Sequence, residues 1–204
     1  MKHTPRPSDT VSRETLERLH AYADLLVAWN RTINLVSKSD VQHLWERHIE
    51  DALQLVPILP RFLPFAVDLG SGGGLPGMVL AIATGTIFHL VESDHRKAAF
   101  LREAARACQA PVTVHATRIE STILPATNCV TARALAPLVD LIGLAHRFLT
   151  PTGVLIAPKG RNVEAELTSA AEQWHMQVTR TTSLTDPAAT ILHITEVSRV
   201  GHLS

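Results

Sequence analysis

The chain is poor in cysteine, has no net charge and lacks long apolar runs. Its two cysteines, Cys108 and Cys129, form neither a C-x-x-C pair nor a zinc-binding spacing. We therefore expect both to be small buried side chains in a reducing compartment. The 19 basic residues balance the 19 acidic ones. This balance argues against binding to nucleic acid through bulk positive charge, although it leaves room for local basic patches.

Membrane and export signals are also absent from the sequence. No segment approaches the roughly 20 consecutive apolar residues that a bilayer-spanning helix needs. The first seven residues, Met-Lys-His-Thr-Pro-Arg-Pro, lack the apolar core of a signal peptide. We therefore expect a cytoplasmic protein that has no membrane partner.

The length and composition are those of a globular α/β protein with one large core. The chain has 204 residues, of which 46% are hydrophobic and 19% charged. Apolar residues recur at helical spacing near 12–29 and again from Val41 to Val56, before Pro57. Ser39 and Gln42 have the spacing of a capping box for the second helix. We assign both helices to an N-terminal extension over 1–60 that precedes one compact domain over 61–204.

Strand and helix patterns alternate from residue 65 onward. The pattern predicts strands near 65–69, 88–92, 112–115, 129–132 and 154–158, and helices near 77–83, 94–108, 137–149 and 163–174. Such alternation is typical of a parallel, doubly wound sheet. Two further strands, near 177–183 and 190–197, have no clear helix between them, and they predict an antiparallel hairpin at one edge.

A glycine-rich turn follows the first of these strands. Residues 66–77 read Ala-Val-Asp-Leu-Gly-Ser-Gly-Gly-Gly-Leu-Pro-Gly. A dinucleotide-binding turn needs its third glycine where Leu75 stands, so that register fails. The pattern D-x-G-x-G-x-G from Asp68 is instead typical of S-adenosylmethionine-dependent methyltransferases, in which a ligand approaches bare backbone. We take Asp68, Gly70 and Gly72 as candidate cofactor residues; the alternative is a plain strand-to-helix connection.

A second acid supports this interpretation. Glu92 ends the strand predicted at 88–92, about twenty residues after the glycine turn. A carboxylate at the carboxyl end of the second parallel strand can accept both ribose hydroxyl protons of an adenosine-containing ligand. The alternative is a solvated carboxylate at the end of a strand.

These motifs, taken in order, define a resemblance. The chain resembles the bacterial 16S ribosomal RNA guanine-N7 methyltransferases, the family of ribosomal RNA small subunit methyltransferase G, also called glucose-inhibited division protein B. The resemblance runs from about residue 16 to about residue 198. Its motifs are Trp29-Asn30, Asn34-Leu35, Arg47-His48-Ile49-Glu50-Asp51, Asp68 to Gly77, Val91-Glu92-Ser93, Arg96-Lys97, Phe100-Leu101, Arg118-Ile119-Glu120, Thr131-Ala132-Arg133-Ala134 and Lys159-Gly160.

The resemblance implies a Rossmann-like S-adenosylmethionine-dependent methyltransferase fold, with a mostly parallel seven-stranded sheet, an antiparallel edge hairpin and two preceding helices. It also implies cofactor contacts at Gly70, Leu75, Ile119, Glu120 and Arg133. Ile119 and Glu120 would border the adenine, and Arg133 would lie beside the methionine end, where its fork of donors suits a carboxylate. The alternatives are a packing arginine at 133 and a loop-capping carboxylate at 120.

At a few positions the chain differs from the residues found most often in the family. Glu92 stands where many members have Asp, and Leu75 stands where many have Phe. Met78-Val79 replace the usual isoleucine-proline. None of these changes removes a group that the chemistry needs, and Glu92 keeps the acceptor with a longer reach.

The absence of two motifs argues against two kinds of methylation reaction. The segment Thr131 to Pro137 lacks the Asn/Asp/Ser-Pro-Pro-aromatic motif of enzymes that methylate exocyclic amines, and neither cysteine has the context of a cytosine-C5 nucleophile. Guanine N7 carries an exposed lone pair and no proton, so its methylation needs alignment and exclusion of water rather than a general base. We therefore assign no catalytic acid or base.

The resemblance implies guanine 527 of 16S rRNA, in the 30S subunit or an assembly intermediate, as the target. For RNA contact we select Lys159, which follows the fifth strand, together with Arg161 and Arg31; the alternative is a set of solvated side chains. His43 and His48 are five residues apart and poorly placed to share a metal, so we predict no metal site. A monomer is our default expectation.

Two other functions compete with this one. The first is a methyltransferase acting on small molecules, which the neutral charge favours and the two N-terminal helices and the full motif series oppose. The second is a noncatalytic module that binds an adenosine ligand, which would predict damage in the glycine turn where none is visible.

Overall fold

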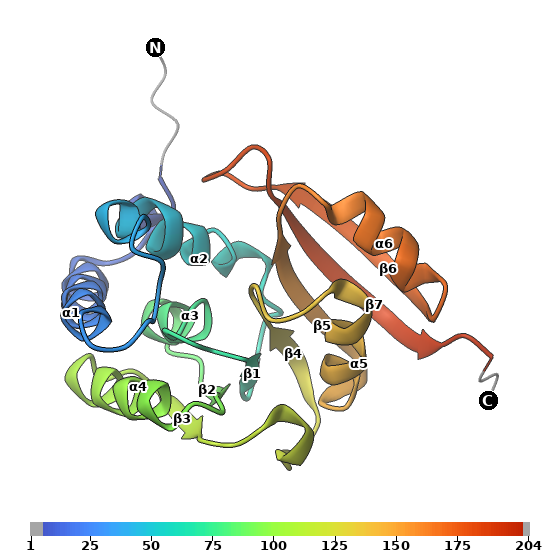
Figure 1. Cartoon of the computed structure of the whole chain (residues 1–204), viewed down its shortest axis with the longest axis horizontal. Helices are drawn as coiled ribbons and strands as arrows, with labels where there is room; N and C mark the ends of the chain where they lie inside the picture. The colour runs from blue at the N-terminus through green and yellow to red at the C-terminus, as the bar shows by residue number, and fades with distance from the viewer. Residues whose placement is uncertain (1–5, 202–204) are drawn as a thin grey trace.

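The computed structural model describes residues 6–201, which form a seven-stranded sheet with helices on both faces (Figure 1). The strands are β1 (Ala66–Leu69), β2 (Phe88–Val91), β3 (Val112–His115), β4 (Thr127–Thr131), β5 (Leu149–Lys159), β6 (Trp174–Thr182) and β7 (Thr190–Arg199). The α-helices are α1 (Arg13–Asn30), α2 (Asp51–Leu53), α3 (Gly77–Thr84), α4 (His95–Ala107), α5 (Leu138–His146) and α6 (Val163–Ala171). The predicted α/β class is confirmed.

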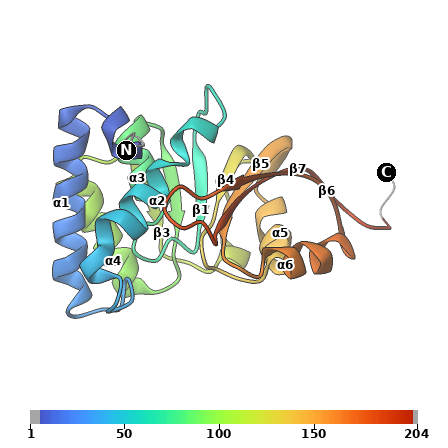
Figure 2. The ribbon, with the colours of Figure 1, turned by 90° about the horizontal axis from the view of Figure 1, so that it is seen from above.

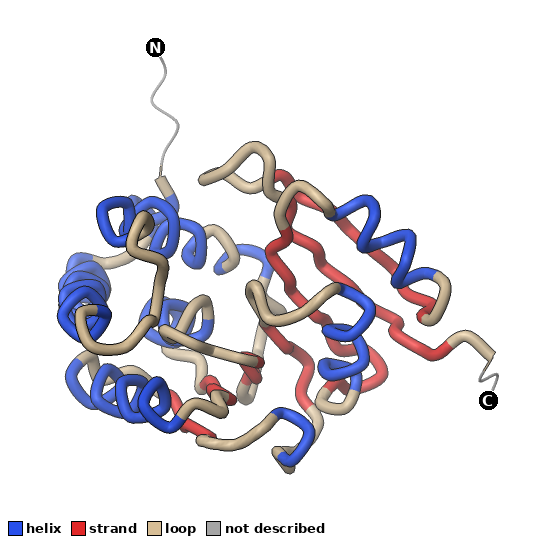
Figure 3. The backbone as a smooth tube through the Cα atoms, viewed as in Figure 1, coloured by secondary structure: helices blue, strands red, loops and turns tan. Residues whose placement is uncertain are grey.

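The strand order places a ligand site at the centre of the sheet. The order is β3-β2-β1-β4-β5-β7-β6, parallel from β3 to β5, with β7 antiparallel to both β5 and β6. The predicted parallel sheet with an antiparallel edge hairpin is thus confirmed, and Figure 3 shows the long strands of that edge. The chain changes direction across the sheet between β1 and β4, and ligands bind outside the carboxyl ends of strands at such a switch point.

Two apolar cores occupy opposite faces of the sheet. Along β1, Ala66 belongs to one core and Val67 to the other, and Leu155 and Ile156 of β5 separate in the same way. This alternation follows from the two-residue period of a strand. Helices α1, α3 and α4 cover the first face and α5 and α6 the second, as Figure 2 shows edge-on.

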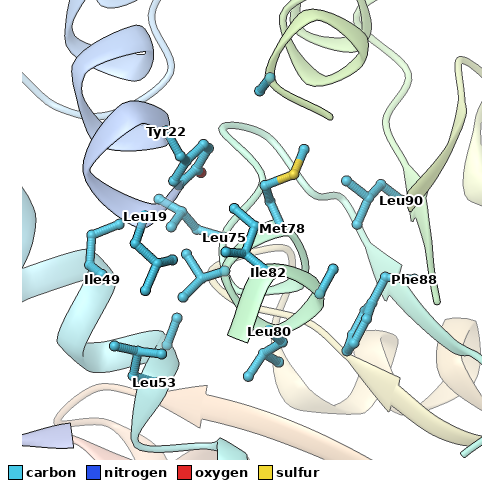
Figure 4. Close-up of a cluster of buried hydrophobic side chains, with 14 of the residues drawn as sticks. Leu19, Tyr22, Ile49, Leu53, Leu75, Met78, Leu80, Ile82, Phe88 and Leu90 are labelled. Atoms are coloured by element: carbon cyan, nitrogen blue, oxygen red, sulfur yellow. The ribbon is translucent and has the colours of Figure 1, made fainter. Parts of the chain in front are cut away.

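Helix α1 is an integral part of the first core. Ser12 caps it by accepting the N–H of Thr15 at 3.1 Å, as expected for a helix predicted near 12–29. Leu19 and Tyr22 belong to the same buried cluster as residues of α3 and β2, and they lie on the α3 side of it (Figure 4). Arg18 donates hydrogen bonds to the carbonyls of Cys108, at 2.8 Å, and of Gln109, at 2.7 Å, just beyond α4.

The prediction of one continuous second helix is wrong. In place of one helix over 41–56 the chain forms η2 (Val41–His43), a π-helical turn η3 (Trp45–Glu50), the short α2, and η4 (Val56–Ile58). The wide π turn allows Glu50 to be buried and to accept hydrogen bonds from Trp45 Nε1 and from Ser8 N, both at 3.0 Å.

The predicted capping box is wrong too, because among residues 6–201 the side chain of Ser39 bonds to Ser37 Oγ and not to the backbone of Gln42, while Ser37 accepts the N–H of Asp40 at 3.2 Å. Two boundaries near the edge of the sheet also differ from prediction. The segment from Leu149 belongs to β5 rather than to the end of a helix, and α6 ends at Ala171, before β6 begins at Trp174.

The hydroxyl of Tyr22 joins α1 to the glycine turn, since it donates a hydrogen bond to the carbonyl of Gly73 inside the core. We expect Tyr22→Phe to lower the free energy of unfolding by about 1–2 kcal/mol, because a buried carbonyl loses its donor while the ring still packs. Urea denaturation measures this change. An unfolding midpoint equal to that of the wild type would show that the bond contributes nothing.

Candidate active site

The turn between β1 and α3 presents bare backbone to solvent. Gly70, Gly72 and Gly74 have φ angles of +64°, +56° and +87°, a region that side chains disfavour. A Cβ built on Gly72 would meet only the carbonyl oxygen of Gly70, at 3.8 Å. The space above Gly72 is therefore open, and a ligand can lie directly against its peptide.

Asp68 lies beneath this turn rather than on the wall of a pocket. Its side chain is fully buried, Oδ1 accepts a hydrogen bond from Thr131 Oγ1 at 2.6 Å, and Oδ2 has no partner among the described residues. Burial raises the pKa of this carboxyl to about 6. The sequence pattern identified Asp68 with the cofactor site; in the structure its side chain bonds to Thr131 of β4, while its backbone carbonyl accepts a hydrogen bond from Ser71 Oγ in the turn at 3.0 Å.

Glu92, at the carboxyl end of β2, reaches the same turn. Its Oε2 accepts the N–H of Gly72 at 2.8 Å, and its Oε1 accepts the N–H of Asp94 at 2.7 Å. Each carboxylate oxygen has capacity for a further hydrogen bond. Glu92 can thus hold the turn and still accept ribose hydroxyl groups.

A pocket of about 440 Å³ lies over the turn and collects the sequence-predicted cofactor residues other than Asp68. Its walls include Gly70, Gly72, Leu75, Glu92, Ile119, Glu120 and Arg133. Leu75 is buried, Ile119 half-buried and Glu120 exposed, so an apolar wall passes into a polar rim. Leu35 and Lys97 also line this pocket. They belong to the motifs Asn34-Leu35 and Arg96-Lys97, but they were not among the predicted cofactor residues.

The N-terminal extension holds Arg133. Its Nη1 donates to Asp51 Oδ2 at 3.2 Å and to the carbonyl of Arg47 at 3.3 Å, and its Nη2 donates to His48 Nδ1 at 2.8 Å. These bonds use three of the five N–H donors of the guanidinium and leave two for a ligand. The sequence motif at 47–51 marked these partners without showing that they meet Arg133.

His48 is neutral at this position. A guanidinium can only donate, so Nδ1 of His48 must accept and the ring proton lies on Nε2. Burial, together with the positive charge of Arg133, lowers the pKa of His48 to about 4. Its Nε2 lies 3.7 Å from Asp40 Oδ2, beyond hydrogen-bonding distance.

We expect NMR titration to give His48 a pKa of about 4, below its ordinary value of 6.5. Because the folded state resists protonation here, His48 contributes stability that is fully present above pH 6.5 and is lost as the pH falls toward 4. A spectrum of His48→Asn assigns the resonance. A midpoint close to 6.5 would contradict the buried hydrogen bond with Arg133.

A larger pocket, of about 870 Å³, adjoins the first. The two share the segment 133–136, which follows β4 and contains Ala134 at a φ of +52°. Backbone strain of this kind concentrates at functional sites. The larger pocket extends from this shared wall to the end of β5 and the loop 183–189 between β6 and β7.

Asp51 joins three walls of the larger pocket. Besides Arg133, its carboxylate accepts hydrogen bonds from Thr185 Oγ1 and Gln54 Nε2, both at 2.8 Å, through Oδ1. One carboxylate thus connects the N-terminal extension, the end of β4 and the loop 183–189, which reaches toward α2 in Figure 1.

The three predicted RNA-binding residues lie in different settings. Lys159 Nζ forms an ion pair with Glu166 at 2.7 Å and donates to the carbonyl of Ala136 at 2.8 Å, with its side chain only 8% exposed. Arg161 and Arg31 are exposed and line neither pocket. The charge of Lys159 is therefore paired within the protein, whereas the two arginines lie at the surface.

Within residues 6–201, no helix is long and apolar enough to cross a membrane. No group of three or more His, Cys, Asp or Glu side chains in that range could hold a metal ion. Cys108 and Cys129 are free and buried, as the sequence predicted.

The fold is that of known methyltransferases. Similar solved structures include magnesium protoporphyrin IX methyltransferase from Synechocystis PCC 6803 with bound SAM, at a TM-score of 0.59 and 14% identity over 91% of this chain and 97% of that one. Another is the ribosomal protein L11 methylase from Lactobacillus delbrueckii subsp. bulgaricus, at a TM-score of 0.58 and 16% identity over 75% and 78%. This chain has the Rossmann-like fold of S-adenosylmethionine-dependent methyltransferases, which confirms the predicted fold class and cofactor.

Sequence comparison identifies the particular family. The family rRNA small subunit methyltransferase G (GidB) matches residues 15–195. A Granulibacter bethesdensis protein named ribosomal RNA small subunit methyltransferase G is 57% identical over 93% of this chain and 89% of its own length. The Gluconobacter oxydans protein of the same name is 52% identical over 94% and 98%. The chain belongs to this family, and the resemblance predicted from the motifs is confirmed.

Proposed function

We propose that the protein transfers the methyl group of S-adenosylmethionine to N7 of a guanine in 16S rRNA, by resemblance guanine 527. The observation that carries this proposal is the family match over residues 15–195, in a chain whose glycine turn is intact. The substrate is the 30S subunit or an assembly intermediate, and such a substrate places the protein in the cytoplasm.

The residues around the smaller pocket fit the cofactor. We assign the ribose hydroxyls to Glu92, one face of the adenine to Ile119, and the adenine amino group to Glu120. The two remaining donors of Arg133 suit the carboxylate of the methionine end. Gly70, Gly72 and Leu75 form the backbone surface and apolar wall beside the ligand, and Asp68 supports the turn. When bound, the cofactor supplies an electrophilic methyl group.

No side chain near the shared wall is needed as a base. His48 has its only lone pair engaged by Arg133, so it cannot take a proton without losing that bond. Guanine N7 carries no proton to remove, and the protein contributes alignment and exclusion of water. His48 is not available as a base, and guanine N7 does not need one. This agreement supports N7 as the acceptor.

We propose that Arg31 and Arg161 contact RNA phosphates, because both are exposed and their charges face solvent. Lys159 would contribute through the ion pair that shapes the larger pocket. We also propose a monomer that needs no metal, organised as the extension 1–60 and the compact domain 61–204.

The test incubates the purified protein with labelled S-adenosylmethionine and, separately, 30S subunits, naked 16S rRNA and a mixture of cell metabolites. Cleavage at 7-methylguanine then maps any modified nucleotide. Label at N7 of one guanine in 16S rRNA supports the proposal. Label confined to metabolites would favour a small-molecule methyltransferase, and binding of the cofactor without any transfer would favour a noncatalytic module.

A further inference from the structure

The larger pocket is lined by one carboxylate that forms no ion pair within residues 6–201. Arg133 pairs with Asp51 at 3.2 Å and Lys159 with Glu166 at 2.7 Å. Asp186 lines the same pocket, and within residues 6–201 no basic group comes within ion-pair distance of it. Only its Oδ1 accepts a hydrogen bond in that range, from Ala188 N at 2.9 Å. Its Oδ2 is available to a ligand.

Hydrogen bonds to the N-terminal extension hold the loop that carries Asp186. Ser183 Oγ is buried and accepts from Gln54 Nε2 at 3.0 Å and from Asp186 N at 3.3 Å. Gln54 Oε1 accepts the N–H of Leu184 at 2.7 Å, and Thr185 is bound to Asp51. A recognition group on such a braced loop is preorganised, which reduces the entropy lost when a ligand binds.

We propose that the larger pocket seats the target guanine, turned out of the RNA, and that Asp186 accepts hydrogen bonds from its N1–H and its 2-amino group. This inference rests on the proposed function and names the residue that selects the base. The volume of about 870 Å³ lies within the range of roughly 300–1,000 Å³ that is usual for ligand pockets. Enzymes that modify a base in structured nucleic acid read its Watson–Crick edge in such a pocket.

The shape of guanine orients it correctly between the two pockets. N7 lies on the opposite edge of the purine from N1 and the 2-amino group. Asp186 lines only the larger pocket, whereas segment 133–136 also lines the cofactor pocket. A guanine held by Asp186 on its Watson–Crick edge therefore directs N7 toward the shared wall and the methyl donor.

The charge of Asp186 also suits the reaction. Methylation at N7 places positive charge on the purine and makes N1–H a stronger donor, so its bond to a carboxylate strengthens in the transition state. Adenine offers an N7 acceptor too, but it presents a lone pair at N1. A carboxylate facing that lone pair repels it, and Asp186 thereby selects guanine.

The test is Asp186→Asn. Asparagine keeps the shape of the side chain and an oxygen for Ala188 N, but it replaces the other acceptor by an amide donor that opposes N1–H. We expect kcat/KM for 16S rRNA to fall by about 100-fold, while affinity for S-adenosylmethionine and the melting temperature stay at wild-type values. Asp24→Asn, an exposed change outside both pockets, is the matched control.

A second substrate tests the contact itself. In 16S rRNA with inosine at the target position the 2-amino group is missing, and we expect the wild type to lose about tenfold in kcat/KM, whereas Asp186→Asn loses no more than about twofold. Equal penalties in both proteins, or wild-type activity of Asp186→Asn on guanine, would overturn the inference. A wild-type protein that forms no 7-methylguanine in any rRNA would instead overturn the proposed function, and the inference with it.

Discussion

Gly72→Val is expected to weaken binding of S-adenosylmethionine by about 100-fold or more. A Cβ at this position would meet only the carbonyl oxygen of Gly70, at 3.8 Å, so a valine side chain would project into the open space assigned to the ligand. The φ of +56° adds backbone strain for a β-branched residue. Isothermal calorimetry with the purified variant measures the affinity.

Gly85→Val separates strain from obstruction. Gly85 also has a positive φ, +73°, and a Cβ there meets nothing within 4 Å, but it caps α3 and lines neither pocket. This control should lose stability and keep its affinity for the cofactor. If Gly72→Val binds the cofactor as tightly as the control, the assignment of the glycine turn as the cofactor site fails.

Arg133→Lys is expected to have the second largest effect. One ammonium cannot replace a planar fork that bonds to His48 and Asp51 and is proposed to bind a ligand carboxylate as well. We expect affinity for S-adenosylmethionine to fall by about 10- to 100-fold, the equivalent of losing charge-assisted hydrogen bonds. Calorimetry again provides the measurement, with Arg180→Lys, an exposed change outside both pockets, as the control.

Decarboxylated S-adenosylmethionine shows whether Arg133 acts on the methionine carboxylate. The wild type should bind this analogue about 10- to 100-fold more weakly than the cofactor. Arg133→Lys should bind the two ligands with nearly equal affinity, because the contact that distinguishes them is gone. A variant that still prefers the intact cofactor as strongly as the wild type does would place the carboxylate elsewhere.

The central part of the fold could be predicted because it depends on local sequence patterns. Buried parallel strands read as short apolar runs, and the glycines after β1 are required by the positive φ angles of the turn. The strand order β3-β2-β1-β4-β5 then brings the carboxyl ends of β1 and β4 together at the switch point. For this reason the pocket residues at 70 and 92 could be predicted from their places at strand ends, whereas Arg133 was predicted through the resemblance to the family.

The unpredicted features depend on contacts between distant segments. The bond from Arg133 to Asp51 joins residues 82 positions apart, and the bond from Thr185 to Asp51 spans 134. The π turn that presents His48 has the same apolar spacing as an ordinary helix over a few residues, so periodicity cannot reveal it. Lys159 was predicted to contact RNA because the sequence does not show that it forms an ion pair with Glu166 of helix α6.

The packing of α1 has a consequence for how the chain matures. Arg18 finds its carbonyl acceptor at Cys108, 90 residues further along, and Tyr22 finds its own at Gly73. During synthesis the first helix therefore emerges well before the surface that it covers, and its apolar face becomes fully buried only after both α3 and α4 have been made. Helix α1 therefore cannot complete its packing in the order of translation, because its partners lie far along the chain.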